Sequence, residues 1–546
     1  MSLSSLSSAP IILDACKKLK HLLHSSFGPM SFHKLIVKYH QHIHPEMIYT
    51  NDGATLVRSL PIVNPIGKIL CDLSKTQEER AGDGTTGVIL LCCELVLRSI
   101  EDLHLKQLLP LDVICNYLFI LKNICVKSFE RMRLLESEKI SRLIYSDKDS
   151  IFHMAKNSLQ SKDIRYMVNH FSTLLIDCFA HGEKVPKQRK FHCIEGGQLS
   201  DSFGFRGLFC NVTSSSFSSK FYHSQNLQSR FHKCNKILLL SRKNQNVNNF
   251  ERTLWKSIFQ IGSTSDSGII ILMEGTFPHL HISYHNNSSV FIFDNMNPKL
   301  LNQISLCIDF PVLKVGSVSQ ISGEELFAIP TTPISEECPS IQCISQELFI
   351  CIPNTCQDMF HFVLRGPSKT IVKETKRSLK DAYEVIKNHF SLLDKAVWSD
   401  HMPSPHQHFL CGGGCHIEFQ LWSDITGQES SQLPASVSEV FSDCILSLPR
   451  MILQSSSFES SRENDLLRLK REYSKHQCEK NTDDHKEEGC FFGIDLFANM
   501  SGSHESVIVE NVLERFLLED SRVKQHMVEL ACETAITLLR ISSVEV

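Results

Sequence analysis

The sequence predicts a multidomain α/β protein, and three observations support this fold class. The chain has 546 residues, more than one ordinary hydrophobic core accommodates, so we expect about two to four domains. Helical periodicity recurs toward both ends of the chain. The middle, residues 200–345, instead contains short apolar runs flanked by turn residues, with one helix-like segment among them. Alternating strands and helices of this kind are typical of a separate α/β domain.

The first elements follow from apolar spacing and from turn residues. Residues 10–27 carry apolar side chains at helical spacing. Gly28 and Pro29 end this helix, because glycine terminates a helix readily and proline cannot continue it. Residues 34–39 and 46–50 are predicted to be two strands, followed by a turn in the letters "NDGAT".

A glycine loop is expected between the next two helices. Asn64 and Pro65 form an N-cap and a first helical position, and the helix then runs to the charged letters "TQEER". The letters "AGDGTTGVILL" follow, so a second helix is expected to begin at Thr85. Its free N–H groups and positive dipole end would face the loop. The residues alone leave two interpretations open, a turn that needs small residues or a site for phosphate and a metal ion.

The remaining elements are predicted from the same patterns. Strands are expected at 236–241, 268–273, 289–294 and 360–366, and helices at 249–261, 373–390 and 519–541. The core-facing residues expected in the last helix are Val523, Met527, Leu530, Ala531, Ala535 and Leu538. Polar segments expected to be surface loops are 145–165, 392–410 and 455–490.

Composition limits the possible functions. The net charge of −4 provides no basic field for binding nucleic acid. No apolar run approaches the ~20 residues that a membrane span requires, and the N-terminus lacks the pattern of a secretory signal. We therefore expect a cytosolic protein, in which most of the 21 cysteines are small buried hydrophobic residues.

Several motifs occur together in a fixed order along the chain. They are "NDGATLVRSLPIVNPIGKIL", "GDGTTGVILLCCELV", "KNSLQSK", "LRGPSKTIVKETKRSLKDAYEVI", "GGG", "GIDLF" and "LLEDSRVKQHMVELACETAITLLRI". In this order they resemble the group II chaperonins over essentially the whole chain. The resemblance implies an α/β multidomain subunit with a mostly helical equatorial domain, a small intermediate domain and an α/β apical domain that binds clients. The implied boundaries are equatorial 1–145 and 396–546, intermediate 146–207 and 359–395, and apical 208–358.

Shorter segments are similar to one subgroup, the chaperonin-like proteins of the McKusick–Kaufman/Bardet–Biedl group, and especially to the McKusick–Kaufman protein. These segments are "NPIGKIL", "ILCCEL", "VGSVS", "IPN" and "GGGC". Only about one helix fits between "LLLS" and "GIIIL", where a ring-forming subunit would carry a long helical lid. This resemblance implies assembly of the ciliary coat complex called the BBSome, with related chaperonin-like proteins and the cytosolic ring chaperonin as partners. The implied locations are the cytoplasm, the centrosome or basal body, and the nucleus.

The family resemblance also implies a site for ATP and Mg²⁺. Asp83 would bind the Mg²⁺, which suits a carboxylate beside phosphate oxygens. Asp52 and Asp381 would position or activate the attacking water. The other nucleotide-binding residues that the resemblance implies are Gly28, Pro29, Gly53, Gly82, Gly84, Thr85, Thr86, Gly413, Gly414 and Glu519.

The same residues also have structural interpretations. Asp52 alone fits a turn aspartate, and Asp83 alone fits a helix N-cap. The family's Gly-Pro-x-Gly ends here in Ser31, which requires a negative φ, and His33 replaces the acidic residue that usually follows. Histidines at 39–45 and 401–411 can be drawn as zinc sites, but solvated loops explain them better.

Three functional hypotheses remain open from the sequence. The first is an assembly chaperone for the BBSome. The second is an ATP-hydrolysing subunit of a closed double ring that folds clients by enclosure. The third is a scaffold that keeps the fold without binding nucleotide.

Overall fold

The computed structural model describes residues 8–40, 43–143, 147–180, 188–211, 234–241, 254, 256, 258, 268–275, 290–314, 327–328, 341–344, 347–353, 359–397, 409–427, 432–455, 462–480, 491–496 and 508–542. The chain divides into two compact units, one of Met1–Ile176 with Lys373–Val546 and one of Asp177–Val372. The middle of the chain therefore forms a unit of its own, as expected for the α/β domain. The finer division into five segments stays a prediction.

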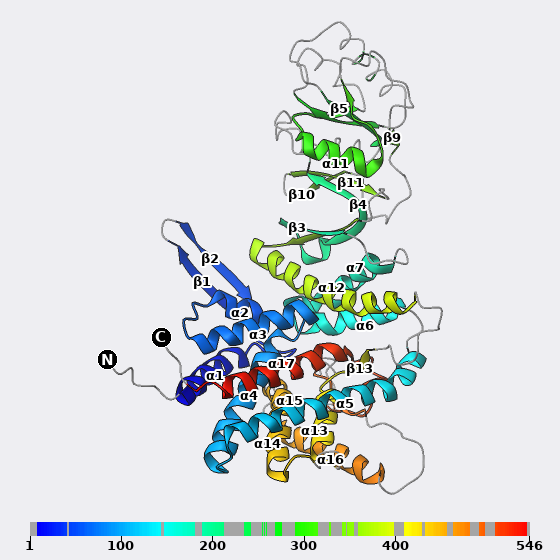
Figure 1. Cartoon of the computed structure of the whole chain (residues 1–546). Helices are drawn as coiled ribbons and strands as arrows, with labels where there is room; N and C mark the ends of the chain where they lie inside the picture. The colour runs from blue at the N-terminus through cyan, green and yellow to red at the C-terminus, as the bar shows by residue number, and fades with distance from the viewer. Residues whose placement is uncertain are drawn as a thin grey trace, which may run out of the picture. The chain divides into compact units, whose positions relative to one another are not determined.

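The first unit is mainly helical (Figure 1). Its N-terminal helices are α1 (Ser8–His24), α2 (Gly53–Ser59), α3 (Pro65–Ala81), α4 (Thr85–Arg98), the π-helix η1 (Ser99–Lys106), α5 (Leu111–Leu143), α6 (Asp147–Gln160) and the 3₁₀ helix η2 (Asp163–Met167). Its C-terminal helices are α13 (His416–Thr426), α14 (Ala435–Ile445), α15 (Ser447–Ser455), α16 (Arg462–Lys480) and α17 (Ser521–Leu539). Helices α7 (Val168–Ala180) and α12 (Lys369–Val397) each continue from one unit into the other.

Helix α4 lies at the centre of the first unit. Apart from Glu94, the helix is apolar from Val88 to Leu97, and all of these residues are buried, including Cys92 and Cys93. A helix without a polar face has to be enclosed by its neighbours. Helices α1, α3, α14 and α17 pack against α4 and complete the largest hydrophobic core.

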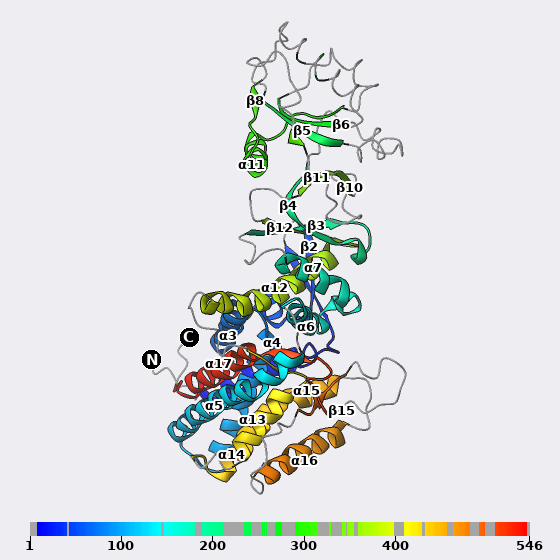
Figure 2. The ribbon, with the colours of Figure 1, turned by 90° about the vertical axis from the view of Figure 1, so that its right-hand side faces the viewer.

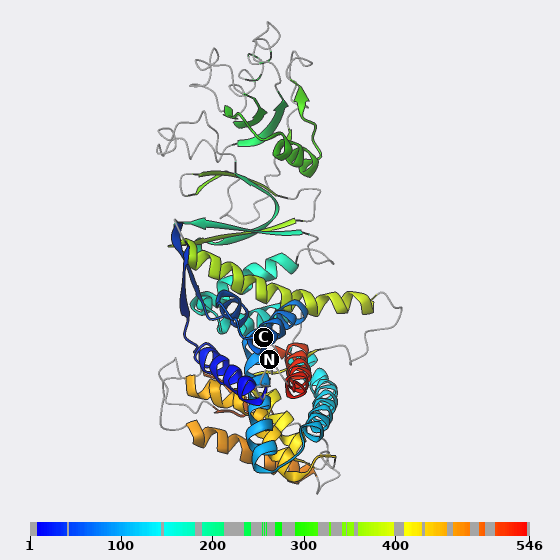
Figure 3. The same ribbon diagram turned by 60° about the vertical axis from the view of Figure 1, so that its left-hand side comes forward.

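Short strand pairs complete the first unit. Strand β1 (Lys34–His40) pairs antiparallel with β2 (Ile43–Thr50), and this hairpin extends from the helices (Figures 1 and 3). Strand β13 (Leu410–Gly412) pairs with β16 (Leu518–Asp520), and β14 (Gly493–Ile494) pairs with β15 (Ile508–Val509). The β13–β16 pair brings the glycine turn after β13 beside the start of α17.

The second unit contains two sheets. One has the strand order β10-β11-β4-β12-β3 and the other the order β7-β6-β5-β8, with β9 paired to β5. The strands of the first sheet are β3 (Gln188–Glu195), β4 (Phe203–Asn211), β10 (Ile341–Ile344), β11 (Glu347–Pro353) and β12 (Met359–Gly366), and the 3₁₀ helix η3 (Leu199–Asp201) precedes β4. The second sheet comprises β5 (Cys234–Ser241), β6 (Gly268–Glu274), β7 (Val290–Phe293), β8 (Leu313–Lys314) and β9 (Phe327–Ala328), with helix α11 (Pro298–Ile308) beside it. Strands β5, β6, β7 and β8 are parallel, which explains their continuous apolar runs.

Most predicted elements of the chain are confirmed. The six predicted strands correspond to β1, β2, β5, β6, β7 and β12. The helices predicted at 373–390 and 519–541 correspond to α12 and α17. Asn64 caps α3, because its Oδ1 accepts from Ile66 N at 2.9 Å. The helix expected at 249–261 lies mostly outside the described residues, as does the lid region that it helped to define.

Two predicted loops are wrong, because both segments contain helices. The segment 145–165 contains α6, and 455–490 contains α16. Each helix buries only a narrow apolar stripe, which its many polar residues obscure in the sequence. The buried residues are Ile151, Met154, Ala155 and Leu159 in α6, and Leu466, Leu469 and Tyr473 in α16. Helix α12 also extends to Val397, into the third predicted loop.

Within the described parts of the chain, no helix combines the length and apolar character that crossing a membrane requires.

Candidate functional site

A cavity of about 250 Å³ lies in the first unit and collects residues from distant parts of the chain. Helix starts, turns and β16 all contribute to its wall. The predicted site residues that line it are Gly28, Pro29, Asp52, Asp83, Gly84, Thr85, Thr86, Gly414 and Glu519. The structure therefore brings together residues from both ends of the sequence in one pocket.

Asp52 is held at the start of α2 with both carboxylate oxygens bound. Its Oδ2 accepts from Thr55 N at 2.8 Å, which makes it the N-cap, and its Oδ1 accepts from Thr85 Oγ1 at 2.9 Å. Burial acts to raise the pKa of Asp52, but Lys162 and these hydrogen bonds outweigh it, so the pKa is lowered. Asp52 is thus an ionised carboxylate that caps a helix and also faces the pocket.

Asp83 lies between two glycines with left-handed backbone. Gly82 (φ 78°) ends α3 and Gly84 (φ 80°) is the N-cap of α4. Asp83 Oδ1 accepts from Gly84 N at 2.7 Å, and its Oδ2 accepts from Ser158 Oγ at 3.3 Å. Because Gly84 offers no side chain to cap α4, the first N–H groups of this 14-residue helix are left for a ligand. The interpretation of Asp83 as the N-cap is therefore wrong by one residue.

Lys162 and Asp381 form an ion pair beside the pocket. Lys162 Nζ lies 2.9 Å from Asp381 Oδ2, and the side chains are 9% and 12% exposed. Burial raises the pKa of Asp381 to about 7. Lys162 opposes this shift, and the carboxylates of Asp52 and Asp83 add to it. Burial lowers the pKa of Lys162, but the three carboxylates raise it above its ordinary value.

Lys162 is a pocket residue that the sequence analysis did not assign. It ends the segment "KNSLQSK", which served only as a family marker. In the sequence Lys162 is a single lysine after small polar residues. This spacing does not indicate that its side chain lies near three carboxylates. Asp381 itself does not line the cavity and reaches it through Lys162.

Three predicted glycines lie behind the wall of the pocket. A Cβ atom at Gly53 would lie 2.4 Å from Thr86 Oγ1, and one at Gly413 would lie 2.8 Å from Glu519 Cγ. A Cβ atom at Gly82 would lie 2.9 Å from the Cβ of Glu384 in α12. Because these three glycines have no side chain, neighbouring elements can approach them closely. Their direct contact with a ligand stays a prediction.

Glu519 and Lys524 form the charged part of the opposite wall. Lys524 Nζ lies 3.5 Å from Glu519 Oε2 and 2.5 Å from Glu418 Oε1. Burial raises the pKa of Glu519, although Lys524 opposes the shift. Asp520, which replaces the family's proline, is the N-cap of α17 and accepts from Arg522 N at 2.9 Å. Val523, expected in the core, lines the pocket instead.

The turn from Gly28 to Ser31, which corresponds to the family's Gly-Pro-x-Gly, has the negative φ that serine requires at its last position. Gly28 is left-handed (φ 94°), whereas Ser31 does not have a positive φ. Ser31 Oγ accepts from Asn51 Nδ2 at 3.0 Å. His33 stacks on Tyr49 with a distance of 4.6 Å between the ring centroids, and burial lowers the pKa of His33. His33 therefore does not replace the negative charge of the family's acidic residue.

The residues present fit a nucleotide and a hard divalent cation. Beside the start of α4, the pocket combines the carboxylates of Asp52 and Asp83 with Lys162, and Glu519 and Lys524 line it as well. Asn51 Oδ1 and Ser26 Oγ, two atoms of lining residues, are buried without a hydrogen-bond partner among the described residues. No group of three metal-ligating side chains occurs in the part of the chain that the structure describes. That donor set suits a cation bound by one or two carboxylates together with phosphate oxygens.

The two histidine-rich segments contribute little to this picture. Residues 41–42 and 401–408 lie outside the described residues. The zinc interpretation of these segments therefore stays untested.

The chain matches the model of the TCP-1/cpn60 chaperonin family over residues 19–545, and it belongs to this family. The resemblance to group II chaperonins is thereby confirmed, and with it the α/β chaperonin subunit and a chaperone role in protein folding. T-complex protein 1 subunit alpha of Dictyostelium discoideum is 23% identical over 96% of this chain and 92% of that protein. The alpha subunit of Arabidopsis thaliana is 21% identical with the same coverage. Subunit eta of Encephalitozoon cuniculi is 28% identical over 36% of this chain and 35% of that protein.

Proposed function

We propose that the protein is a chaperonin subunit that binds ATP with Mg²⁺ and couples its hydrolysis to the folding or assembly of client proteins. The observation that carries this proposal is the pocket in which Asp52, Asp83 and Lys162 face the open start of α4. Asp83 is the residue that would hold Mg²⁺, which supplies charge neutralisation of the phosphates when bound. The N–H groups of α4 and the ammonium of Lys162 favour an anionic ligand in the same space.

The carboxylates have distinct roles in this proposal. Asp52 is ionised and fixed at both oxygens, so it orients a water molecule without moving. Asp381 has a pKa near 7, and its Oδ2 is bound to Lys162. Asp381 does not line the cavity, so its other oxygen, Oδ1, would accept a proton from the attacking water only after Asp381 moves into the cavity. A base whose pKa lies near the working pH is the efficient choice for this step.

Binding and turnover can be measured separately on the purified full-length chain. Titration calorimetry with ATP and Mg²⁺ is expected to show binding that Asp83→Ala weakens by about tenfold or more, because the carboxylate for the cation is lost. Asp381→Asn is expected to keep binding and to reduce phosphate release by roughly 10²-fold or more. Asp14→Ala, which removes only an exposed pair with Lys18, is the matched control.

The proposal fails if the parent chain does not bind ATP. It also fails if Asp83→Ala binds ATP with Mg²⁺ as tightly as the parent and the control do. If the parent binds ATP but releases no phosphate, the protein is a chaperone that binds nucleotide without hydrolysing it. The roles proposed for Asp52 and Asp381 are then wrong.

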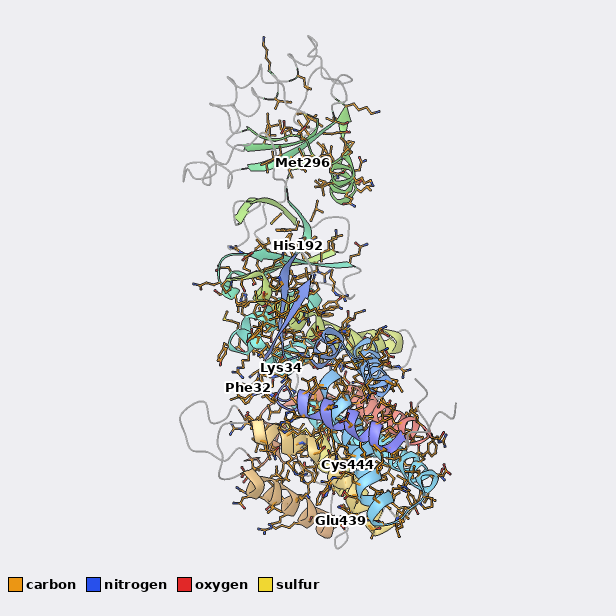
Figure 4. The ribbon with its side chains drawn as sticks, turned by 90° about the vertical axis from the view of Figure 1, so that its left-hand side faces the viewer. Phe32, Lys34, His192, Met296, Glu439 and Cys444 are labelled. Carbon is orange, nitrogen blue, oxygen red and sulfur yellow. The ribbon has the colours of Figure 1, made fainter. Side chains whose placement is uncertain are left out.

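The first candidate setting is a ring made of chaperonin subunits. The curated relatives are named as subunits of T-complex protein 1. One face of the β1–β2 hairpin is apolar and exposed, with Leu35 at 60%, Tyr39 at 84% and Met47 at 57%. Phe32 and Lys34 mark the start of this hairpin in Figure 4. A neighbouring subunit of the ring is the partner that would cover this face.

The second candidate setting is assembly of the BBSome near the centrosome or basal body. Its support is the set of subgroup-like segments, together with Ser31 and His33, which depart from the family's Gly-Pro-x-Gly pattern and the acidic residue after it. The partners would be chaperonin-like proteins of the Bardet–Biedl group and the cytosolic ring chaperonin. Co-purification with BBSome subunits from ciliated cells tests this setting, and a ring of this chain that excludes those partners contradicts it.

A further inference from the structure

A buried network of three side chains lies behind the nucleotide pocket. Glu136 comes from α5, His416 begins α13, and Tyr473 comes from α16. Helix α13 packs against both α5 and α16, as Figure 2 shows. His416 Nε2 lies 3.0 Å from Glu136 Oε1, and His416 Nδ1 lies 2.6 Å from Tyr473 Oη. All three residues are at most 2% exposed.

The outer contacts of the network determine where its protons lie. Tyr473 Oη lies 2.7 Å from Phe492 O, which is a carbonyl and only accepts, so the hydroxyl proton points there. The hydroxyl oxygen is then an acceptor toward His416, and Nδ1 must carry a proton. At the other end, Glu136 Oε2 accepts from Gly412 N at 2.7 Å.

One further proton is required between His416 and Glu136. A neutral imidazole with its proton on Nδ1 would turn the lone pair of Nε2 toward the carboxylate at 3.0 Å, which is repulsive. We assign this proton to His416, because the Glu136 carboxylate then accepts two hydrogen bonds and pairs with an imidazolium. Burial and the charge of Glu136 raise the pKa of the adjacent Cys411 thiol well above its ordinary value, so that thiol stays neutral.

The network holds the two segments that form the glycine wall of the pocket. Gly412 is bound by Glu136, and the turn that follows has left-handed backbone at Gly414 (φ 61°) and at Cys415 (φ 67°). A left-handed residue other than glycine is strained and persists only where its surroundings hold it. Tyr473 binds Phe492, which directly precedes β14, and Ile494 N donates to Gly414 O at 2.7 Å.

We propose that Glu136, His416 and Tyr473 are positioning residues for the nucleotide pocket, and that they act through an imidazolium held between the glutamate and the tyrosine. The network keeps Gly414 and Cys415 on one side and Ile494 on the other in the places where they line the cavity. This inference rests on the proposed nucleotide binding.

The protonation state is tested without any nucleotide. The full-length chain labelled with ¹⁵N-histidine is expected to show, among the signals of its 26 histidines, one with protons on both ring nitrogens that is lost in His416→Gln. In Glu136→Gln the amide accepts from Gly412 and donates to Nε2, so His416 is expected to become neutral with its proton on Nδ1. A neutral His416 in the parent overturns the assignment.

The positioning role is tested by calorimetry with ATP and Mg²⁺. Tyr473→Phe leaves Nδ1–H and Phe492 O unpaired and is expected to weaken ATP binding roughly tenfold, equivalent to about 1.4 kcal/mol. Glu136→Gln keeps the hydrogen bonds of the network but removes the ion pair with the imidazolium, so it is expected to weaken ATP binding by less than Tyr473→Phe does. Leu469→Ala, a buried position on the same helix as Tyr473, is the control for lost stability.

The outcomes separate this inference from the proposed function. If Tyr473→Phe binds ATP like the parent, or if Leu469→Ala weakens binding as much, the network is merely structural and the inference is wrong. If the parent fails to bind ATP while both ring nitrogens of His416 carry protons, the proposed function fails and the assignment of the proton stands.

Discussion

Three carboxylates meet one buried lysine at the pocket. Asp381 contacts Lys162 directly, and Asp52 and Asp83 contribute to raising the pKa of this lysine. The carboxylates of Asp52 and Asp83 oppose the ionisation of Asp381, which is part of the reason that the pKa of Asp381 is about 7. The positive charge of Lys162 therefore reduces the repulsion among these carboxylates, so they can lie close together at the pocket.

We predict that Lys162→Met weakens nucleotide binding and lowers the midpoint of thermal unfolding. The substitution keeps the length of the side chain but leaves Asp381 buried without its cation, which is a costly arrangement. Calorimetry and differential scanning fluorimetry measure the two effects. The double variant Lys162→Met/Asp381→Asn is expected to recover the unfolding midpoint, because it removes the uncompensated charge. A double variant no more stable than Lys162→Met would contradict this electrostatic explanation.

Helix α12 brings two acidic side chains to this region. Besides Asp381 it carries Glu374, whose Oε1 accepts from Thr50 Oγ1 at 2.8 Å at the end of β2. Thr50 Oγ1 in turn accepts from Asp52 N at 3.1 Å. One hydrogen-bonded chain therefore joins α12 to the residue that caps α2. Burial raises the pKa of Glu374 from 4.5 to about 6, although Arg377 opposes the shift.

We predict that Glu374→Gln changes how stability depends on pH. Between pH 4.5 and about 6 the folded protein binds more protons at Glu374 than the unfolded chain does. The free energy of unfolding of the parent therefore falls as pH rises through this window, by about 2 kcal/mol from this group. The glutamine variant does not titrate and lacks this loss. Its unfolding midpoint relative to the parent is expected to be higher at pH 7 than at pH 4, as measured by thermal scans.

Lys376→Gln, on the same helix, serves as the control for a changed net charge. A difference between parent and Glu374→Gln that stays constant from pH 4 to pH 7 would show that Glu374 does not titrate in this range.

At the scale of the whole molecule, the first unit carries both the pocket and the exposed hairpin. The strand register places Val37 opposite Met47, so the apolar side chains of β1 and β2 lie on one face. Residues of this size are seldom left together in water without a partner. The proposed ring assembly and the proposed nucleotide site are therefore separate features of the same unit.

We predict that Leu35→Asp with Tyr39→Asp reduces the particle to single chains. If this face contacts a neighbouring subunit, the parent forms particles many times the 62.1 kDa of one chain, as measured by light scattering. The charged variant elutes as one chain, because two carboxylates cannot be buried in an apolar contact. Lys38→Gln, which alternates with these residues along β1, is expected to assemble like the parent. A parent that is itself monomeric would favour the assembly-chaperone setting over the ring.

Local sequence predicted most elements because their causes are local. Asn64 and Pro65 indicated the start of α3, and the glycines around Asp83 indicated the loop before α4. The same reasoning failed for α6 and α16, where a narrow apolar stripe in a polar sequence is recognisable only once the surface that covers it is known. Motif order found nine pocket-lining residues, whereas Lys162 and Lys524 needed the structure.

The sequence by itself indicated the family, the order of most elements and the positions of the glycine turns. The tertiary structure decided which charged groups meet. Lys162 and Asp381 are 219 positions apart, and Glu136 and His416 are 280 apart. The pKa of each such group depends on its burial and on neighbours that only packing supplies. The spacing of residues along the chain indicates periodicity over a few turns. It does not indicate which residues that are hundreds of positions apart will contact each other.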